Sequence, residues 1–171
     1  MEEKKVLIQR SLVLAKPDAI SRGLVGEILT RFEKVGLKIV GLKMVWPTAE
    51  LLFEHYETVG QMITRRGQDK FDMTVKFMQQ SPVIAFCFEG VEAVKEIRKM
   101  VGTTEPLSAN PGTIRGDYAH MSFAYGDAAS TGIPNLVHAS GDPEEAKKEI
   151  ALWFKDEELF DYPVANQPYM Y

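Results

Sequence analysis

The stretch "SLVLAKPDAISRGLVGEILTRFEKVGLKIVGLKMVW", residues 11–46, decides the fold because it places two strands around one helix. Residues 11–15 form a short apolar run that is typical of a buried strand. Apolar residues then recur at helical spacing, at Leu24, Ile28, Leu29, Phe32 and Val35. We expect Ser21 to cap this helix and Gly36 to adopt the left-handed conformation that ends one. Residues 37–46 are rich in β-branched and large apolar side chains and predict a second, longer strand.

The middle of the chain continues this alternation. A helix is predicted from Pro47-Thr48 towards Tyr56, and another over "FDMTVKFM", while "ETVGQMITRRGQDK" between them is interpreted as irregular or partly helical. The apolar run at 83–88 predicts a strand in the centre of a sheet, with its Cys87 a core residue rather than a nucleophile.

A further helix is predicted within "GVEAVKEIRKMVG", residues 90–102, with Val94, Ile97 and Val101 facing inward. Residues 103–116 contain two prolines and two glycines and indicate a long ordered loop. The segment "YAHMSF", residues 118–123, has the weak pattern of a possible fourth strand.

The last helix has the clearest start signal. Asp142 at the cap, Pro143 at the first helical position and Glu145 three residues after the cap resemble a capping box. One face of the helix carries Ala146, Ile150 and Trp153. Glu149 falls near the edge of this apolar face, and because an unpaired buried charge is costly, we expect it to have a partner.

Together these elements predict an α+β fold in a single domain over residues 1–171. The order strand–helix–strand–helix–strand–helix–strand indicates a ferredoxin-like sandwich, a four-stranded antiparallel sheet with helices packed on one face. A length of 171 residues is sufficient for one domain with a substantial core.

The composition excludes several broad classes of function. A net charge of −4 argues against a general nucleic-acid or acidic-membrane surface, so an anion site would have to be a local cluster of bases. The one cysteine excludes an internal disulfide, and no apolar run approaches membrane-spanning length, so we expect a cytoplasmic protein. "GLVGE" lacks the Gly-Lys-Ser/Thr ending of a P-loop.

The segment "IPNLVHASGD", residues 133–142, raises the question of function. His138 ends an apolar run that suggests a buried strand, and small residues follow it. From this segment alone, the imidazole is either a hydrogen-bonded packing residue or a group held for chemistry. Several polar residues taken singly read as ordinary surface groups, and their combination must decide.

The combination resembles the nucleoside diphosphate kinases. The matching segments run in the order of that family: "KPDAISRGLVGEILTRFEKVGLKIVGLKM" from Lys16, "EHY" ending at Tyr56, "PGTIRGD" at 111–117, "NLVHAS" at 135–140 and "EIALWF" at 149–154. The resemblance covers most of residues 11–162. It implies a ping-pong enzyme that moves the γ-phosphate of a nucleoside triphosphate onto a histidine and then onto a nucleoside diphosphate.

The resemblance also implies roles for individual residues. His138 matches the nucleophile, Glu149 the glutamate that supports it, and Ser140 belongs to the same network. The implied catalytic residues are His138, Glu149, Lys16 and Tyr56. The implied nucleotide-binding residues are Lys16, Arg98, Thr104, Arg115, Asn135 and Phe71. His55 and His120 are expected to be structural or exposed.

These residue types suit phosphoryl transfer, in which positioning and charge stabilisation dominate. Arg98 and Arg115 offer planar forks that match phosphate oxygens, and Lys16 offers a compact charge. With an ordinary pKa near 6.5, a histidine is largely neutral and nucleophilic at pH 7. Glu149 would fix its tautomer; which ring nitrogen attacks stays open.

The family's cofactor and partners follow from the same resemblance. Mg²⁺ would enter on the nucleotide phosphates, so we expect no dedicated protein metal cage. The partners are nucleoside di- and triphosphates and further copies of the chain, with a hexamer as the expected oligomer and the loop around Pro106 as a subunit contact. Neither a membrane nor a specific nucleic acid is expected as a partner.

The chain departs from the family pattern in two insertions, near 57–70 and 122–134. The family clamps the base between a phenylalanine and an apolar residue, whereas the aligned positions here are Lys70, beside Phe71, and Ser122. We therefore expect the insertions to remodel the base clamp or the subunit contacts. Gly141 replaces a common aspartate, for which Asp142 is a candidate substitute.

A competing hypothesis is a non-catalytic nucleotide-binding or regulatory ferredoxin-like module. Such a module would be expected to lose its phosphate-binding residues, but this chain retains the complete set. The "NQPYMY" tail is expected to cover either a neighbouring subunit or its own domain.

Overall fold

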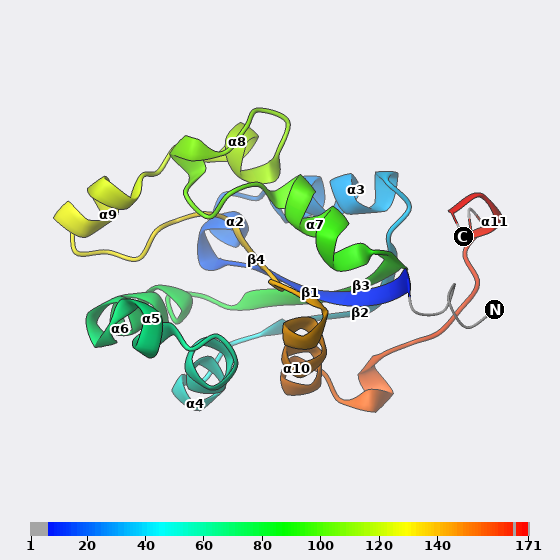
Figure 1. Ribbon diagram of the computed structural model, residues 1–171, viewed down its shortest axis with the longest axis horizontal. Helices are drawn as coiled ribbons and strands as arrows, with labels where there is room; N and C mark the ends of the chain where they lie inside the picture. The colour runs from blue at the N-terminus through cyan, green and yellow to red at the C-terminus, as the bar shows by residue number, and fades with distance from the viewer. Residues whose placement is uncertain (1–6, 166, 171) are drawn as a thin grey trace.

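The computed structural model describes residues 7–165 and 167–170, and it contains a four-stranded antiparallel sheet (Figure 1). The strands are β1 (Ile8–Ala15), β2 (Lys38–Val45), β3 (Val83–Val91) and β4 (Val137–Ala139). Their order across the sheet is β2-β3-β1-β4. Each of the two strand–helix–strand units is therefore split by a strand of the other unit, which confirms the predicted ferredoxin-like α+β fold.

The helical elements occupy the connections between the strands and the C-terminal part of the chain. They are α2 (Pro17–Ser21), α3 (Val25–Lys34), α4 (Ala49–Phe53), the π-helical η1 (Glu54–Val59), α5 (Met62–Arg66), α6 (Gln68–Met78), α7 (Ala93–Val101), the 3-10 turn η2 (Pro106–Ser108), α8 (Ile114–Tyr118), α9 (Phe123–Ala128), α10 (Pro143–Trp153), the 3-10 turn η3 (Asp156–Glu158) and α11 (Gln167–Met170). Among the described residues, none of these helices is long and apolar enough to cross a membrane.

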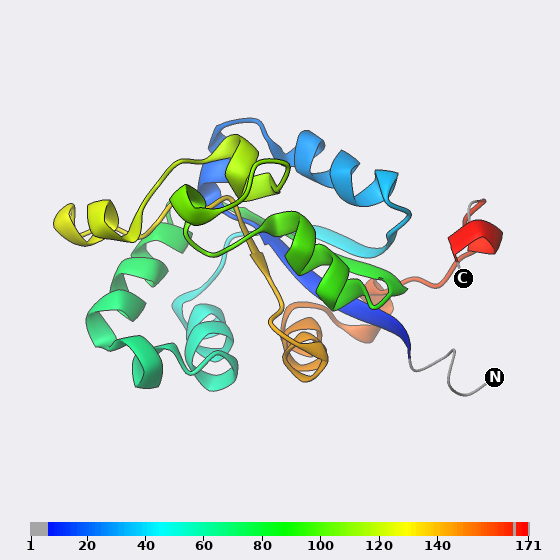
Figure 2. The same ribbon diagram turned by 45° about the horizontal axis from the view of Figure 1, so that its top comes forward.

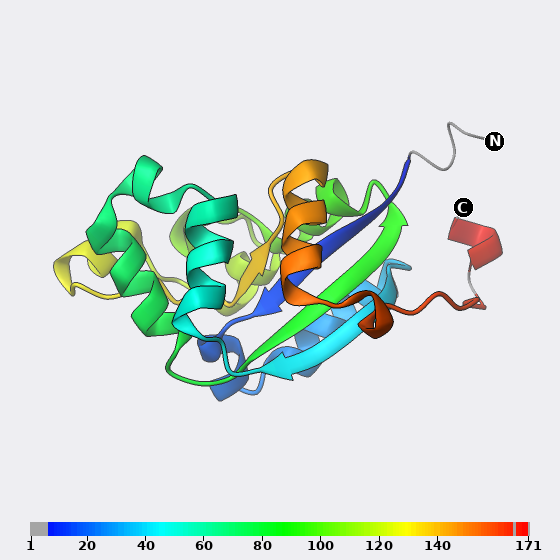
Figure 3. The same cartoon turned by 90° about the horizontal axis from the view of Figure 1, so that it is seen from below.

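Helices cover both faces of the sheet, so the prediction that they pack on one face is wrong (Figures 1 and 3). Alternate residues of β1 belong to different cores: Val13 packs with α3 and α7, and Leu14 packs with α4, α6 and α10. Because most of β3 and the second half of β1 are continuous apolar runs, both of their faces need cover there. The long connection between β2 and β3 supplies much of that cover on the second face.

The fourth strand is β4, and the prediction of a strand at residues 118–123 is wrong. Val137, His138 and Ala139 pair with Ala15, Leu14 and Val13 of β1. Residues 118–123 instead connect α8 to α9, where Ser122 caps α9 by accepting a hydrogen bond from the Tyr125 amide at 3.1 Å. Cap formation outweighs the weak strand pattern at this point.

Two predicted helix boundaries have different outcomes. Ser21 does not cap α3, because Gly23 at φ +68° separates it from that helix; its hydroxyl donates instead to the Asp18 carbonyl. The predicted end at Gly36 is confirmed, with φ +89°. The predicted start of α10 is also confirmed, since Asp142 Oδ1 accepts from the Glu145 amide at 2.8 Å.

Short helices occur in both segments for which no regular element was predicted, residues 57–70 and 103–116. Residues 57–70 include α5 and the start of α6, and the loop 103–116 includes η2 and the first turn of α8. Figure 2 shows α9 beside the α5–α6 segment, at the end of the molecule away from the chain termini. The two insertions are therefore neighbours in space.

The chain after α10 runs along its own domain (Figure 3). The Phe160 amide donates to the Val40 carbonyl at 2.7 Å, and the Tyr162 hydroxyl donates to the Ile39 carbonyl at 2.6 Å. Part of the β2 edge is thus covered from within the chain. Asn166 and Tyr171 of the aromatic tail lie outside the described residues.

Candidate active site

A cavity of about 730 Å³ collects the polar residues that the sequence singled out. Its lining includes Lys16, Tyr56, Arg98, Thr104, Arg115, Asn135, His138 and Glu149. These residues come from η1, α7, α8, β4, α10, two loops and the turn between β1 and α2, so the fold rather than sequence proximity brings them together.

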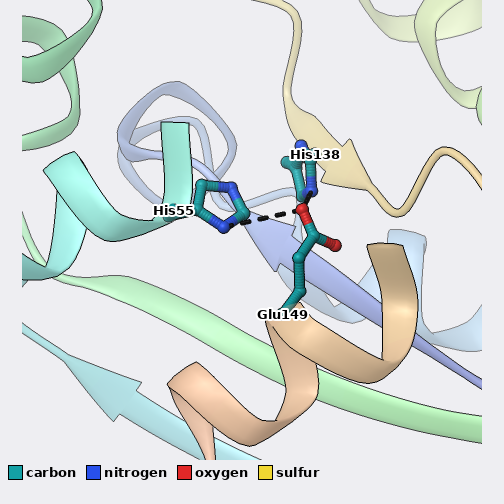
Figure 4. A group of neighbouring side chains, drawn as sticks. All are labelled: His55, His138 and Glu149. Carbon is teal, nitrogen blue, oxygen red and sulfur yellow. Dashed lines mark hydrogen bonds and ion pairs between the residues drawn. The ribbon is translucent and has the colours of Figure 1, made fainter. Parts of the chain in front are cut away.

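His138 and Glu149 form the chemical centre of this cavity (Figure 4). Because side chains alternate along β4, Val137 and Ala139 enter the core beneath α3 and α7, while His138 points towards α10. Glu149 lies on the buried face of α10 with Ile150. The His138 Nε2 and Glu149 Oε1 atoms are 2.7 Å apart.

Ser140 completes the support of this carboxylate. Its buried hydroxyl donates to Glu149 Oε2 at 2.6 Å and accepts from the Leu12 amide at 3.1 Å. Glu149 therefore has a different partner on each oxygen, and β1 fixes one of them. The predicted inward orientation of Glu149, with a partner, is confirmed.

The charge on Glu149 sets the tautomer of the histidine. Burial alone would raise the pKa of Glu149, but His138, His55 and the hydroxyl of Ser140 outweigh burial and lower it to about 2. The carboxylate is therefore ionised at neutral pH and accepts the Nε2 proton of His138. Nδ1 is left as the ring nitrogen with a lone pair.

His55 is a buried neighbour of this pair that the sequence did not assign to the site. Its ring packs edge-to-face against the His138 ring, with centroids 4.5 Å apart. Its Nδ1 accepts from Trp153 Nε1 at 3.2 Å and lies 3.6 Å from Glu149 Oε1. Burial, followed by the charge of His138, lowers the pKa of His55 to about 3, so the ring is neutral. His120 is exposed, as expected.

His55, His138 and Glu149 are also close enough together to be considered as metal ligands, with one ligand atom from each within 4.8 Å of the others. The hydrogen bond between His138 Nε2 and Glu149 Oε1 and the one from Trp153 Nε1 to His55 Nδ1 together involve one such atom of each residue. The group is accounted for as a hydrogen-bonded network that orients His138.

Lys16 and Asn135 form the polar wall beside the histidine. Lys16 Nζ donates to Asn135 Oδ1 at 2.8 Å, and Asn135 Nδ2 donates to the Thr104 carbonyl at 2.8 Å. Burial, followed by the charge of Arg115, lowers the pKa of Lys16 to about 8. Lys16 is therefore a half-buried cation that is charged at neutral pH and close to titration.

The two arginines differ in how their donors are used. Arg115 is buried and donates to the carbonyls of Asn135, Gly102 and Val137 at 3.1, 3.0 and 2.6 Å. It thereby fixes the backbone that leads into β4. Arg98 lines the cavity, and no carboxylate within the described chain lies at ion-pair distance from it. Arg98 is thus the more available phosphate donor.

Tyr56 lines the cavity with a buried hydroxyl that has no hydrogen-bond partner among the described residues. Burial, followed by the charge of Glu149, raises its pKa, so the hydroxyl stays protonated and can donate. Phe71 is placed differently: its ring packs on Phe53 with centroids 5.8 Å apart, outside the cavity lining. The structure gives no support to a contact between Phe71 and a nucleotide.

The insertions contribute lining residues that the sequence did not identify. Arg66, Phe123 and Asp127 all line the cavity. Their only signal in the sequence is the extra length of the two segments, which does not reveal where the side chains point. Of the two residues aligned with the family's base clamp, Lys70 lines the cavity and Ser122 caps α9.

The structure also changes which residue can substitute for the aspartate that Gly141 replaces. Asp142 is engaged as the cap of α10. Glu145 lines the cavity beside His138, and its Oε2 accepts from the Gly141 amide at 2.7 Å. Glu145 is therefore the carboxylate available at this position.

Comparison with known proteins places this chain in a family. The family described as nucleoside diphosphate kinase matches residues 9–159. The nucleoside diphosphate kinase of Pyrococcus horikoshii is 47% identical over 157 residues, which are 92% of this chain and 92% of the relative. That of Borreliella burgdorferi is 41% identical over 157 residues, 92% of this chain and 93% of the relative.

Solved structures agree with the sequence relatives. A transition-state mimic of the Borrelia burgdorferi enzyme with vanadate and ADP has a TM-score of 0.93 at 39% identity, covering 96% of this chain and 98% of that chain. The Halobacterium salinarum enzyme in complex with CDP has a TM-score of 0.81 at 37% identity, covering 95% and 98%. The chain belongs to the nucleoside diphosphate kinase family.

Proposed function

We propose that this nucleoside diphosphate kinase transfers the γ-phosphate of a nucleoside triphosphate to a nucleoside diphosphate through a phosphohistidine at His138. The observation that carries the proposal is the 2.7 Å contact between His138 Nε2 and the ionised Glu149, in a cavity that also contains Lys16 and Arg98. This contact favours the tautomer with the ring proton on Nε2, which leaves Nδ1 as the nucleophile. The ADP and CDP held by the two solved relatives support nucleoside diphosphates as ligands.

The reaction consists of two mirrored displacements. The Nδ1 lone pair of His138 forms a bond to the γ-phosphorus as the bond to the β–γ bridging oxygen breaks, and its electron pair leaves with the nucleoside diphosphate. The ring gains positive charge, which Glu149 stabilises through Nε2. A second nucleoside diphosphate then attacks the phosphorus through its terminal oxygen, and the N–P electron pair returns to Nδ1.

The wall of the cavity stabilises the negative charge on the transferring group. Lys16 and Arg98 supply positive charge, and the unpartnered Tyr56 hydroxyl supplies a hydrogen-bond donor. Asn135 and Thr104 complete the polar wall. Arg115 acts mainly by fixing the backbone before β4, although two of its five N–H groups are not used by the three carbonyls and can reach substrate.

A divalent metal, which we expect to be Mg²⁺, would be held mainly by the phosphates of the nucleotide. Glu145 is the residue of this chain that would contact it, directly or through water, because it lines the same cavity as His138. When bound, the metal neutralises phosphate charge. Hard oxygen ligands of this kind suit Mg²⁺.

The assembly is also part of this proposal. Alternate residues on the β2 edge, Leu42, Met44 and Trp46, are 52%, 60% and 62% exposed, which makes an apolar stripe on an open strand. Leu107, in the loop around Pro106, is 67% exposed. We propose that these two surfaces contact further copies of the chain, in a hexamer. Native mass measurement tests the order, and a monomer would contradict it.

We propose that the chain is a single domain over residues 1–171. Its insertions, near 57–70 and 122–134, shape the part of the cavity that receives the base of the nucleotide. Deleting residues 124–133 should leave a folded protein with weaker nucleotide binding. Unchanged kinetics and assembly in the deletion variant would contradict this assignment. A cytoplasmic location is a further part of the proposal, to be checked by cell fractionation.

The activity is tested by incubating the protein with γ-labelled ATP and Mg²⁺. We expect an acid-labile, alkali-stable label that is absent in His138→Ala and that moves to GDP when GDP is added. A protein that binds nucleotide without becoming labelled would instead be the non-catalytic module, which the retained site residues do not favour.

A further inference from the structure

The part of the cavity lined by the two insertions contains an aromatic ring covered by a cation. Phe123, the first residue of α9, is half-buried, and the guanidinium Cζ of Arg66 at the end of α5 lies 5.9 Å from the centroid of its ring. No carboxylate among the described residues pairs with Arg66. The π face of Phe123 is thus the main partner of this guanidinium.

Three contacts hold Phe123 in place. Its amide donates to Glu105 Oε1 at 2.8 Å, which ties the start of α9 to the loop before α8. Lys70 forms an ion pair with Asp127, which ties α9 to α6. Gly132 packs so closely on α6 that a Cβ there would lie 2.8 Å from Phe77 Cβ. The ring is therefore a fixed surface rather than the tip of a free loop.

The position of this ring relative to the chemistry determines which part of a nucleotide it meets. The phosphates must lie at His138, beside Lys16 and Arg98. The base must then extend into the part of the same cavity that α5, α6 and α9 line, since these segments lie away from the sheet (Figure 2). An aromatic face in that part matches a nucleobase, because every base has a π face.

We propose that the ring of Phe123 is the platform on which the nucleobase stacks, and that Arg66 leaves this ring for the phosphates when a nucleotide binds. The inference rests on the proposed function and adds the residues that read the base. A base between two flat groups needs about 3.5 Å on each side, the van der Waals contact distance between carbon atoms. The 5.9 Å between Arg66 and Phe123 is too little for a base between them, so the base replaces the guanidinium.

The direction of Arg66's movement follows from its surroundings. Arg66 lines the same cavity as Lys16 and is close enough for its charge to contribute to the lowered pKa of that residue. The guanidinium therefore shares one cavity with the phosphate-binding lysine. In exchanging a π face for a phosphate, Arg66 gains a charge-assisted contact, which couples base stacking to phosphate binding.

The test compares the dissociation constants of ADP and inorganic pyrophosphate by calorimetry, with the full chain and with no phosphoryl transfer taking place. Phe123→Ala and Phe123→Leu should weaken ADP binding about 5- to 150-fold, the range of base–aromatic stacking. Pyrophosphate binding should not weaken, because loss of the ring only frees Arg66 for the phosphates, and Phe123→Trp should bind ADP like the natural chain. Tyr125→Ala, an exposed aromatic residue in the same helix, is the matched control and should change neither constant.

The exchange of Arg66 gives a second readout. Arg66→Ala should weaken the binding of ADP and the binding of pyrophosphate by a similar factor. Weakening of ADP alone would show that the base lies between the two side chains, and it would overturn the exchange. Unchanged ADP affinity in both Phe123→Ala and Phe123→Leu would overturn the platform. Neither result bears on whether ATP labels His138, so the proposed function fails or stands separately.

Discussion

Replacing Glu149 with glutamine isolates the charge behind His138. The amide can still accept from His138 Nε2 and keeps the size of the side chain, while the Ser140 hydroxyl, now facing an NH₂ group, can act as an acceptor. What is lost is the negative charge 2.7 Å from a ring that becomes positive as phosphate bonds to Nδ1. The variant therefore separates charge stabilisation from tautomer control.

The size of the effect follows from the burial of the pair. A hydrogen bond to a charged group contributes about 1.5–3 kcal/mol, against about 1 kcal/mol for a neutral one. Two unit charges about 4 Å apart interact by about 4 kcal/mol at the effective dielectric of a protein site, which sets the upper bound. Because the amide keeps a neutral hydrogen bond, the loss is about 0.5–4 kcal/mol, which corresponds to a labelling rate that is about 2- to 1,000-fold slower.

The assay is the single-turnover rate of His138 labelling at saturating ATP, measured by rapid quench. Glu144→Gln, an exposed carboxylate in the first turn of α10, is the matched control and should keep the natural rate. Circular dichroism establishes that Glu149→Gln is folded. A folded variant that labels within twofold of the natural rate would refute the role assigned to this charge.

Three further predictions test neighbouring parts of the account. Since the pKa of Lys16 is lowered to about 8, the lysine loses its charge as pH rises through 8, and the KM for ATP should rise there. Lys16→Gln should have a high KM without this further rise. A KM that does not change with pH in the natural protein would contradict the role of the lysine charge. His55→Phe leaves the Trp153 N–H without its acceptor and should lower the free energy of unfolding by about 1–3 kcal/mol in urea, an effect that Trp153→Phe should largely remove; an unchanged urea midpoint would count against the bond. Gly132→Ala forces a Cβ to within 2.8 Å of Phe77 Cβ and 3.2 Å of the Met73 carbonyl, so it should cost about 1–3 kcal/mol of stability and speed hydrogen exchange in α9; unaltered exchange would show that the segment does not dock there.

The parts of the fold that could be predicted from the sequence are those with strong local signals. Asp142 and Pro143 determine the start of α10 through cap chemistry, and helical periodicity then orients Glu149 inward. The apolar runs of β1 and β3 were identifiable for a similar reason. A continuous apolar run also indicates that both faces of a strand are buried, and this would have predicted helices on the second face of the sheet. The prediction of a one-sided sheet did not use that signal.

The parts that could not be predicted depend on long-range placement. β4 has only three residues, and its pairing with β1 is a tertiary contact that no local pattern reveals. Phe123 and Arg66 come from segments 57 residues apart and meet only because α9 docks on α6. Phe71 illustrates the opposite error, because a residue adjacent to an aligned position on a helix can face the core instead of the cavity.

The most direct test of the central claim is to identify the atom that carries the phosphate. Phosphoenzyme prepared with ATP and Mg²⁺ is examined by ³¹P–¹H correlation NMR, and the sample is then mixed with GDP. We expect the phosphorus to couple to the His138 ring through Nδ1 and the label to appear in GTP. Phosphate on Nε2, on another residue, or on His138 but not transferable to GDP would contradict the account.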